Sequence, residues 1–573
     1  MAGSIKAVVF DLDDTLFDCS GTLLQASRER AARALIEGGL PMTVEEALDL
    51  QEELAAQHGP HFLVFDEIAR RYDLPQGAVD RAFRVYNRDR VEAIAPFPDV
   101  KPTLSHLRQR GIMCFLLSTG VHRRQAAKVE RLGLADYFDE VIINDVDRGG
   151  LMSECLRYLM DRHRLRADET MVVGDRPQEE IRVGNDLGAV TVQMMHGRFS
   201  EFEPRDEGER PDVHIARIFQ VPTLISLINM GRPPRALRIV AIGGGTGLPI
   251  VLEGCKTYCN EPAGIVTVTD SGRSSGRLRE ELGVLPPGDA RNCLVALSEA
   301  GERERLLNEL FQYRFDQGSF EGMSLGNLVI AAMTDLTGDF MHGIGVLSKL
   351  LNIRGKVLPP TTEDCHICAE LEDGSHRTGE VNVRELDKPR IKKLYLQPEA
   401  PPACEETVRE ILNADIVMIG PGSLFTSVSA NLLVPGIRQA LADTEAVKIY
   451  VANIVTQPGQ TDGFGAEDHL RAILQCTGEG VVDYALFNSQ FPSEDILDRY
   501  RREGAAPVLP DPDMDFGGVE VLTANLVEDL DQKRVLWEKQ DLLRHHPDKL
   551  ADAVCRIYAG LPLDVNGGRQ VSE

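Results

Sequence analysis

Residues 7–15 read AVVFDLDDT, a short run of β-branched and aromatic residues that ends in the carboxylates of Asp11 and Asp13. A run of this composition predicts a buried parallel strand. Open α/β sheets bind their ligands at the carboxyl ends of such strands. Two acids placed two residues apart are what aspartyl-phosphate chemistry requires, namely a nucleophile and a proton donor beside a divalent cation. The start of the chain therefore predicts a parallel α/β domain with a phosphoryl-transfer site.

The length and charge of the chain restrict the remaining possibilities. A chain of 573 residues is expected to form two or more domains, each with its own core. The net charge of −27 argues against sequence-independent binding to nucleic acid or to an anionic membrane. No signal segment precedes the first strand, and no run reaches the roughly 18 apolar residues of a membrane helix. We expect a cytoplasmic protein whose partners are small molecules, with a homo-oligomer as one possible assembly.

The 11 cysteines are scattered without a spaced framework, which is typical of a reducing compartment. One Cys-x-x-Cys pair, Cys365 and Cys368, lies in an alternating stretch with no second pair nearby. This context favours a plain strand over a metal or redox site.

Alternating strand and helix patterns predict the fold class α/β, with two doubly wound, Rossmann-like domains. The first domain is expected over residues 1–229, and residues of about 18–95 show only helical periodicity, which predicts an inserted helical cap. Residues 230–235 contain Pro-Pro and form the predicted linker. The second domain is expected over residues 236–573. The other strands predicted in the first domain are 112–117, 140–143, 170–173, 189–193 and one after residue 212.

Further polar segments follow predicted strands of the first domain. Ser118-Thr119-Gly120 offers a hydroxyl and backbone amides for a phosphate, and Gly174-Asp175 ends another apolar strand. Glu179 and Glu180 open the helix after it. Carboxylates at strand ends suit Mg²⁺, which binds one or two carboxylates together with water and substrate oxygens. Three such segments at three strand ends favour a phosphate site over surface turns.

These segments resemble the haloacid dehalogenase superfamily of phosphohydrolases, in the subgroup with a helical cap. The matching stretches are residues 10–16, 118–120 and 173–181, and the resemblance covers about residues 5–229. It implies that Asp11 is the nucleophile, Asp13 the general acid/base and Ser118 a phosphate ligand. It also implies a Mg²⁺ ion held by Asp11, Asp13 and Asp175, with Glu180 at a position where the family usually has an aspartate.

One cation of the family pattern has no obvious counterpart in this chain. The family's lysine aligns near Gly149, so Arg148 is the candidate to replace it, although a planar guanidinium is not equivalent to an ammonium group. Lys128 lies on the preceding predicted helix and is expected at the surface. Losing one cation at a phosphoryl site costs on the order of 10²–10³ in rate. The domain is therefore expected to be a weak phosphatase or a former one.

A second strand-to-helix turn rich in glycine occurs in the other half of the chain. The predicted strand 237–242 leads directly into residues Gly243, Gly244, Gly245, Thr246 and Gly247. Such a turn lets backbone amides and a helix N-terminus contact phosphate oxygens. Because Leu248 holds the last position of a G-x-G-x-x-G pattern, the turn alone is weak support for a nucleotide.

Several other loops of small polar residues follow predicted strands in this half, which suits a phosphorylated or nucleotide ligand. Stretches 274–279, 286–292, 355–359, 420–427, 431–437 and 453–459 resemble the gluconeogenesis factor family, also described as uridine diphosphate-N-acetylglucosamine-binding proteins. That family belongs to a wider group similar to 2-phospho-L-lactate transferase, and the resemblance covers about residues 236–560. Besides the glycine-rich turn, the candidate ligand contacts are Asp270, Ser274, Ser275, Asn292, Asn327, Gly422, Ser423, Ser427, Asn431, Asn453, Tyr500 and Arg544.

The resemblance implies a factor in carbon metabolism and cell shape that binds nucleotide sugars. Two functions of the second domain remain open. It is either a ligand sensor without chemistry of its own, or a transferase that moves a phospho-acid group from a nucleotide-activated donor. Asp270 could hold a metal or orient a hydroxyl in the transferase. We expect no acid/base pair in these loops, which favours the sensor, and we expect His469 and His545 to be structural or exposed to solvent.

Overall fold

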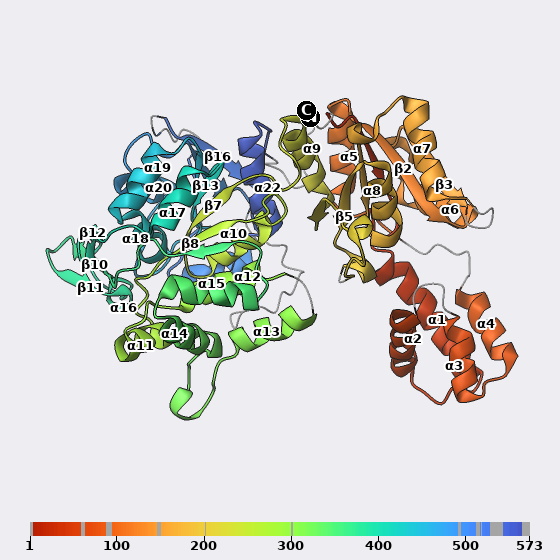
Figure 1. The fold of residues 1–573 in the computed structure, drawn as a ribbon, viewed down its shortest axis with the longest axis horizontal. Helices are drawn as coiled ribbons and strands as arrows, with labels where there is room; N and C mark the ends of the chain where they lie inside the picture. Colours follow the sequence, from red (N-terminus) through yellow and green to blue (C-terminus); the bar gives the residue numbers. More distant parts are fainter. Residues whose placement is uncertain are drawn as a thin grey trace. The chain divides into compact units, whose positions relative to one another are not determined.

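The computed structural model describes residues 4–58, 63–86, 94–145, 150–200, 202–299, 302–490, 494–511, 516, 518–527 and 543–563. The chain divides into two compact units, Met1–Gly231 and Arg232–Glu573 (Figure 1). Each unit has its own sheet and its own core, and we describe each by itself.

Unit 1 is built on a six-stranded parallel sheet. Its strands follow the order β3-β2-β1-β4-β5-β6. In the register of the central strands, Phe10 pairs with both Leu116 and Val173. The strands are β1 (Ala7–Phe10), β2 (Met113–Gly120), β3 (Glu140–Asp145), β4 (Thr170–Gly174), β5 (Val190–Met194) and β6 (Val213–Ile215).

Helices alternate with these strands along the chain and cover the sheet (Figure 1). All four residues of β1 are buried, as expected for a central parallel strand that is covered on both faces. On one face Val9 and Phe115 pack with Leu159 of a covering helix. The helices are α5 (Val100–Gln109), α6 (His122–Leu132), α7 (Met152–His163), α8 (Arg182–Leu187) and α9 (Val221–Asn229).

Between β1 and α5, a helical cap forms a separate bundle with its own hydrophobic core (Figure 1). Leu35, Leu54 and Ile68 are buried at its centre. A short helical turn, η1 (Ser20–Leu24), leads into this bundle. The cap helices are α1 (Gln25–Glu37), α2 (Val44–His58), α3 (Val64–Tyr72) and α4 (Gln76–Tyr86).

Unit 2 contains a seven-stranded parallel sheet in the order β16-β15-β14-β13-β7-β8-β9. Its strands are β7 (Ile239–Gly243), β8 (Ala263–Val266), β9 (Lys356–Leu358), β13 (Ile416–Ile419), β14 (Val447–Val451), β15 (Tyr484–Asn488) and β16 (Glu520–Ala524). A small antiparallel sheet, β10 (His366–Leu371), β11 (His376–Thr378) and β12 (Ile391–Gln397), is inserted between β9 and β13. The two parallel sheets confirm the predicted α/β, Rossmann-like fold class.

The helices of unit 2 follow the same alternation. They are α10 (Gly247–Cys255), α11 (Arg273–Leu282), α12 (Gly288–Leu297), α13 (Glu302–Gln312), α14 (Leu325–Thr337), α15 (Phe340–Leu350), α16 (Glu380–Val383), α17 (Glu405–Leu412), α18 (Ala430–Leu432), α19 (Pro435–Asp443), α20 (Ala466–Thr477), α21 (Glu494–Arg502) and α22 (Pro547–Tyr558). None of the helices in the described part of the chain is long and apolar enough to cross a membrane. Cys368 lies in β10 and Cys365 just before it, and both are buried.

Each sheet has a point where the strand order reverses, and in doubly wound folds ligands bind there, beyond the carboxyl ends of the strands. In unit 1 this point lies between β1 and β4, and in unit 2 it lies between β7 and β13. Asp11 and Asp175 follow directly after β1 and β4. The glycine-rich turn and the Gly420–Ser423 loop follow β7 and β13. The topology therefore brings the main predicted segments together in both units.

Candidate functional site

The first site of unit 1 is built around the two acids that follow β1. The Asp11 N–H donates to the carbonyl of Val173, 2.9 Å away, which ties the end of β1 to the end of β4. Asp11 is 5% exposed, and Asp175 beyond β4 is 1% exposed. Asp11 and Asp175 therefore lie together at the switch point of the sheet, where the sequence predicts them.

Helix α6 supplies two side chains that hold Asp13 and Ser118. The ammonium group of Lys128 lies 2.7 Å from each carboxylate oxygen of Asp13. The amide of Gln125 donates to Asp13 Oδ2 at 3.0 Å and to Ser118 Oγ at 2.9 Å. Gln125 and Lys128 are three residues apart, so they lie on one face of the helix. Together they link the β1 and β2 segments of the site.

The prediction that Lys128 is at the surface is wrong. Its side chain is 5% exposed, and it forms a buried ion pair with Asp13. Its helix begins two residues after Gly120, so the first turns of α6 stand beside the site, and the face that carries Lys128 also carries buried Val129 and Leu132. The spacing of these apolar residues is the sequence feature that indicates a buried position for Lys128. Arg148, the predicted replacement for the family lysine, lies outside the described residues.

Charge is distributed unevenly among the acids of this site. Burial raises the pKa of Asp11, and the nearby charges of Glu180 and Asp13 raise it further. Burial and the charge of Asp11 raise the pKa of Asp175, while burial and Asp175 raise the pKa of Glu180 to about 8. Burial alone would also raise the pKa of Asp13, but Lys128 lowers it below its ordinary value. Asp13 is thus paired with a cation, whereas the other three acids repel one another and the charge of Arg176 offsets only part of the rise in their pKa values.

In unit 2 the loops at the switch point contact one another directly. The Asn431 amide donates to the carbonyl of Gly243 at 2.9 Å, and the Gly422 N–H donates to Asn453 Oδ1 at 3.2 Å. A Cβ at Gly247 would lie 2.5 Å from the carbonyl oxygen of Pro421, so only glycine fits this approach. The predicted loops after β7, β13 and β14 therefore form one continuous surface.

The predicted residues that follow β8 form the other side of this surface. β8 ends at Val266, so Asp270 lies in the loop beyond it. Asn327 donates to Ser274 Oγ at 3.2 Å. A Cβ at Gly288 would approach Ser275 Oγ to 2.6 Å. The start of α12 thus lies against the start of α11.

Three carboxylates meet in this surface, which corrects the expectation that its loops hold no acid/base pair. Asp289 lies against the glycine-rich turn, because a Cβ at Gly244 would be 2.3 Å from its Oδ2. Burial and the charge of Asp270 raise the pKa of Asp289 to about 7. Burial, and a hydrogen bond with Asp270, raise the pKa of Glu380 to about 8. These acids come from α12, the β8 loop and α16, so their proximity is a product of tertiary folding.

A buried arginine beside these acids was missed by the sequence analysis. Arg291 is 5% exposed, and its guanidinium donates to Asn292 Oδ1 at 2.8 Å. Its Nε and Nη1 atoms have no hydrogen-bond partner among the described residues. Buried donors of this kind are costly unless a partner satisfies them. Arg291 and Asn292 therefore offer a ready position for an anionic or carbonyl oxygen.

Tyr500 and Arg544 lie farther along the same edge, beyond β15 and β16. The N–H of Leu543, the residue before Arg544, donates to the hydroxyl of Tyr500. The fold therefore brings the segment of Arg544 to Tyr500, the other predicted ligand contact of this edge. His469 and His545 are both buried, and burial lowers the pKa of His545 to about 4. His469 Nδ1 lies 2.8 Å from the carbonyl of Gly465, which fits a structural role.

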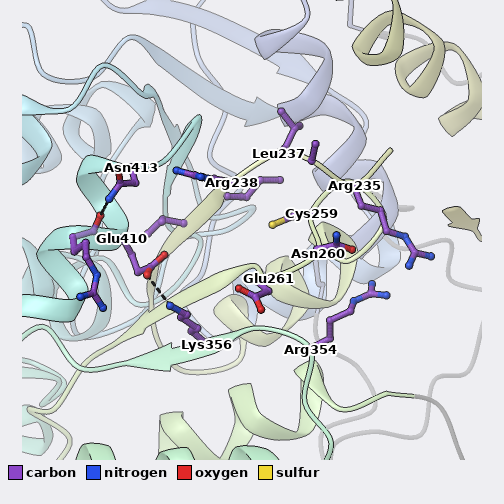
Figure 2. Close-up of a pocket in the computed structure, with 14 residues that line it drawn as sticks. Arg235, Leu237, Arg238, Cys259, Asn260, Glu261, Arg354, Lys356, Glu410 and Asn413 are labelled. Atoms are coloured by element: carbon purple, nitrogen blue, oxygen red, sulfur yellow. Dashed lines mark hydrogen bonds and ion pairs between the residues drawn. The ribbon is translucent and has the colours of Figure 1, made fainter. Parts of the chain in front are cut away.

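A cleft of about 770 Å³ lies at the opposite edge of the same sheet, at the amino ends of β7, β8 and β9 (Figure 2). Several basic side chains line it, but acids neutralise the central ones. Lys356 Nζ lies 2.8 Å from Glu410 Oε1, and Arg354 Nε lies 3.2 Å from Glu299 Oε1. The lining residues are Arg235, Ala236, Leu237, Arg238, Ile239, Val240, Cys259, Asn260, Glu261, Arg354, Lys356, Arg409, Glu410 and Asn413. This cleft contains none of the predicted ligand contacts.

Comparison with known proteins identifies the second unit. A model of the 2-phospho-L-lactate transferase family matches residues 239–527. The gluconeogenesis factor of Halalkalibacterium halodurans is 44% identical over 317 residues, which cover 55% of this chain and 95% of that protein. The chain belongs to the gluconeogenesis factor family. The family member of Bacillus subtilis strain 168 is 43% identical over 323 residues, covering 56% of this chain and 97% of that protein.

A solved structure and a second family model complete the comparison. The crystal structure of a UPF0052 family protein from Bacillus halodurans has a TM-score of 0.52 and 44% identity, covering 56% of this chain and 99% of that chain. Residues 5–188 match the haloacid dehalogenase-like hydrolase family. The chain therefore joins a haloacid dehalogenase-like hydrolase domain to a gluconeogenesis factor domain, and both family resemblances seen in the sequence are confirmed.

Haloacid dehalogenase-like hydrolases generally use Mg²⁺, and the acids of unit 1 fit such an ion. Asp175 Oδ1 is buried and has no hydrogen-bond partner among the described residues. Burial, and then the charges of neighbouring acids, raise the pKa values of Asp11 and Asp175, and Arg176 offsets only part of this effect. Oxygen donors that repel one another in this way are the ligand set that a small divalent cation prefers.

Proposed function

We propose that unit 1 is a Mg²⁺-dependent phosphomonoester hydrolase and that unit 2 binds a uridine diphosphate sugar, with uridine diphosphate-N-acetylglucosamine as the first candidate. The observation that carries the hydrolase proposal is the buried group of Asp11, Asp13 and Asp175, in which Lys128 neutralises only Asp13. Asp11, Asp175 and Glu180 are the acids that would hold the ion, with Asp13 beside them.

In this proposal Asp11 attacks the phosphorus atom of the substrate and forms an aspartyl phosphate while the ester oxygen leaves. Asp13 donates a proton to that oxygen and then accepts one from the water that hydrolyses the intermediate. Ser118, held by Gln125 at 2.9 Å, binds a phosphoryl oxygen. When bound, Mg²⁺ supplies charge neutralisation between the phosphoryl group and the carboxylates.

The ion pair with Lys128 affects these two steps differently. Because Lys128 lowers the pKa of Asp13, it favours the carboxylate form. That form is ready to act as a base in the hydrolysis of the intermediate, but it is a poor proton donor to the leaving group. We therefore expect aryl phosphates, whose leaving groups need little protonation, to be cleaved faster than alkyl phosphates.

The first experiment measures phosphate release from an aryl phosphate by the full chain, with Mg²⁺ and with excess chelator. We expect release only with Mg²⁺, and we expect Asp11→Asn to abolish it because the nucleophile is lost. A matched control is Asp168→Asn, which changes an exposed acid ion-paired with Arg166 at 2.8 Å. Equal activity of the Asp11→Asn protein contradicts the assignment. Absence of all activity in the parent protein favours a former enzyme.

For unit 2, the proposal rests on the contacts among the loops after β7, β13 and β14 and on the unsatisfied donors of Arg291. Backbone amides at a glycine-rich turn suit a diphosphate. Relatives in this family carry the name gluconeogenesis factor. These observations support a ligand-sensing factor in carbon metabolism.

Isothermal titration of the full chain with uridine diphosphate-N-acetylglucosamine tests this part of the proposal. We expect binding and an increase in Tm, because a ligand that binds only the folded state stabilises it by about 2.7 kcal/mol at a hundredfold excess over Kd. Uridine monophosphate, which lacks the N-acetylglucosamine and one phosphate, is the control and should bind more weakly. No heat with the nucleotide sugar contradicts the proposed ligand.

A second function of unit 2 is favoured by the meeting of Asp270, Asp289 and Glu380. The raised pKa values of Asp289 and Glu380, about 7 and about 8, suit a group that exchanges a proton near neutral pH. A transferase that moves a phospho-acid group onto a hydroxyl needs such a base. Binding of a guanosine nucleotide in preference to the uridine diphosphate sugar would support this transferase over the sensor.

A further inference from the structure

Gln125 occupies a buried position in the unit 1 site. Its residue is 3% exposed, and it lies on the buried face of α6 together with Lys128. A Cβ at Gly120 would lie 3.1 Å from Cγ of Gln125 and 3.2 Å from its Nε2. The segment that follows Ser118 therefore passes directly against the amide of Gln125.

Three acceptor atoms surround the amide nitrogen of Gln125. Nε2 lies 3.0 Å from Asp13 Oδ2, 2.9 Å from Ser118 Oγ and 3.1 Å from the carbonyl oxygen of Thr119. The opposite orientation of the amide would set its oxygen against the ionised carboxylate and the carbonyl, which only accept hydrogen bonds. These contacts therefore fix Nε2, and not Oε1, on the side of the three acceptors.

This orientation of the amide decides which way the Ser118 hydroxyl points. Because Gln125 donates to Ser118 Oγ, that oxygen is the acceptor and its own hydrogen turns away from the amide. Ser118 is 1% exposed, and the structure gives its hydroxyl no hydrogen bond to an acceptor among the described residues. The hydroxyl therefore has a donor to offer to a phosphoryl oxygen.

Stability alone does not account for this arrangement. Lys128 already pairs with Asp13 at 2.7 Å, so the carboxylate has a cation without Gln125. Gln125 Oε1 is buried and has no hydrogen-bond partner in the described part of the chain, which lowers stability. An apolar side chain of similar shape would avoid this cost, so the amide is better explained by the groups that it orients.

Resting on the proposed hydrolase function, we propose that Gln125 is a positioning residue that acts through Ser118. Its amide donates to Ser118 Oγ and thereby directs the Ser118 hydroxyl hydrogen to a phosphoryl oxygen of the substrate. A hydrogen bond from a hydroxyl to a phosphoryl anion is charge-assisted, so the direction of the hydroxyl matters for affinity. Since the same amide donates to Asp13 Oδ2, it also keeps the proton-transfer group and the phosphate ligand in one arrangement.

A double-mutant cycle with inorganic phosphate tests whether Gln125 acts through Ser118. Isothermal titration of the full chain with Mg²⁺ present gives the Kd of phosphate for the parent, Ser118→Ala, Gln125→Met and the double variant. We expect Ser118→Ala to weaken binding by about tenfold to a hundredfold and Gln125→Met to weaken it by about five- to tenfold. In the Ser118→Ala background, Gln125→Met should change Kd by less than about twofold, because the hydroxyl that Gln125 positions is gone.

Three further variants separate positioning from a general loss of stability. Gln125→His keeps a ring N–H at a similar reach and should recover part of the affinity at pH 8, where an imidazole is ordinarily neutral. Gln125→Ala repeats the cycle with a smaller side chain, which keeps the test available if Gln125→Met does not fold. Gln51→Met changes a buried glutamine of the cap that donates to the carbonyl of Arg28 at 3.3 Å, and it should leave the Kd of phosphate unchanged even where it lowers Tm.

An equal loss of affinity from Gln125→Met with and without the Ser118 hydroxyl overturns the inference. Phosphate binding by Gln125→Met that equals the parent, or a parent protein that binds no phosphate, also overturns it. The proposed hydrolase function fails on a different measurement, the release of phosphate from an aryl phosphate. A parent protein that shows the expected cycle but releases no phosphate would keep the inference and refute the hydrolase, whereas an active hydrolase with additive losses would refute only the inference.

Discussion

The ligand edges of the two units occupy the same place in similar parallel sheets, but different groups follow their strands. In unit 1 the strand ends carry carboxylates, with Lys128 paired to one of them. In unit 2 the strands are followed by glycines, hydroxyls and amides, with a group of three acids beside them, and two donors of buried Arg291 have no partner among the described residues. At the first edge the acids outnumber Lys128 and Arg176, the cations that the described residues place beside them, and the second edge offers hydrogen-bond donors.

This difference shows what topology decides and what it leaves to the residues. The reversal of strand order between β1 and β4, and between β7 and β13, fixes where each site lies. The side chains at those strand ends then determine whether the site attracts a metal and a phosphoryl group or the oxygens of a diphosphate. In the proposed functions, the same scaffold therefore serves two different ligands in one chain.

The largest effect is expected from Lys128→Met, which removes the cation that forms the ion pair with Asp13. Activity should fall by about 10²–10³, because a single electrostatic contact at a reacting group is worth that much. Stability should fall by about 3–5 kcal/mol, because Asp13 is left as an uncompensated charge in a largely buried position. Phosphate release and urea unfolding of the full chain measure the two effects.

A surface ion pair of nearly equal length provides the control for this change. Lys6 lies 2.6 Å from Glu169, but its side chain is 57% exposed, so Lys6→Met should cost about 1 kcal/mol or less. The double variant Lys128→Met/Asp13→Asn should recover stability without activity. Because the folded pKa of Asp13 is lowered, the stabilisation by Lys128 is present above the ordinary value of 3.8 and is lost as the pH falls through the lower folded pKa. An equal cost of both lysine changes contradicts the prediction.

The contrast between Lys128 and the acids of the same site also shows which site residues can be predicted from the sequence. Asp11, Asp13 and Asp175 are predictable because each directly follows an apolar strand, and parallel strands end at one edge. The role of Lys128 is not predictable in this way, since it depends on which face of α6 turns toward the sheet. A close reading of its spacing from Gln125 and Leu132 would have indicated the buried face.

Unit 2 shows the same limit of prediction from sequence more clearly. The glycine-rich turn and the Gly420–Ser423 loop are local patterns that the sequence reveals. Asp270 and Glu380 are 110 residues apart, and nothing in their spacing indicates that the small inserted sheet brings α16 to the β8 loop. Their meeting with Asp289 is a consequence of long-range packing, so the acid cluster could be found only in the structure.

A smaller effect is expected from Arg544→Ala, which tests whether unit 2 uses charge as well as backbone donors. Loss of a charge-assisted contact to a diphosphate should weaken binding of uridine diphosphate-N-acetylglucosamine by about tenfold to a hundredfold. Isothermal titration of the full chain measures this change. Arg502→Ala, an exposed arginine at the end of α21, is the control and should bind like the parent. If Arg544→Ala also binds like the parent, the diphosphate lies elsewhere along the edge.

The last test concerns a feature that the two sites share, a buried acid with a raised pKa. Asp289→Asn should stabilise unit 2 at pH 8 by on the order of 2–4 kcal/mol, because it removes a charge whose burial raises the pKa to about 7. Since the folded pKa lies above the unfolded one, the folded parent takes up a proton as the pH falls, and its stability rises between about pH 7 and pH 4. The advantage of the variant should therefore shrink over that range. Calorimetric unfolding of the full chain at pH 8, 6 and 4 measures it, with Glu309→Gln, an exposed acid of α13, as the control. A variant that is less stable than the parent at pH 8 would mean that the charged Asp289 is held by donors such as the Gly245 N–H, and that unit 2 tolerates buried negative charge better than unit 1 does.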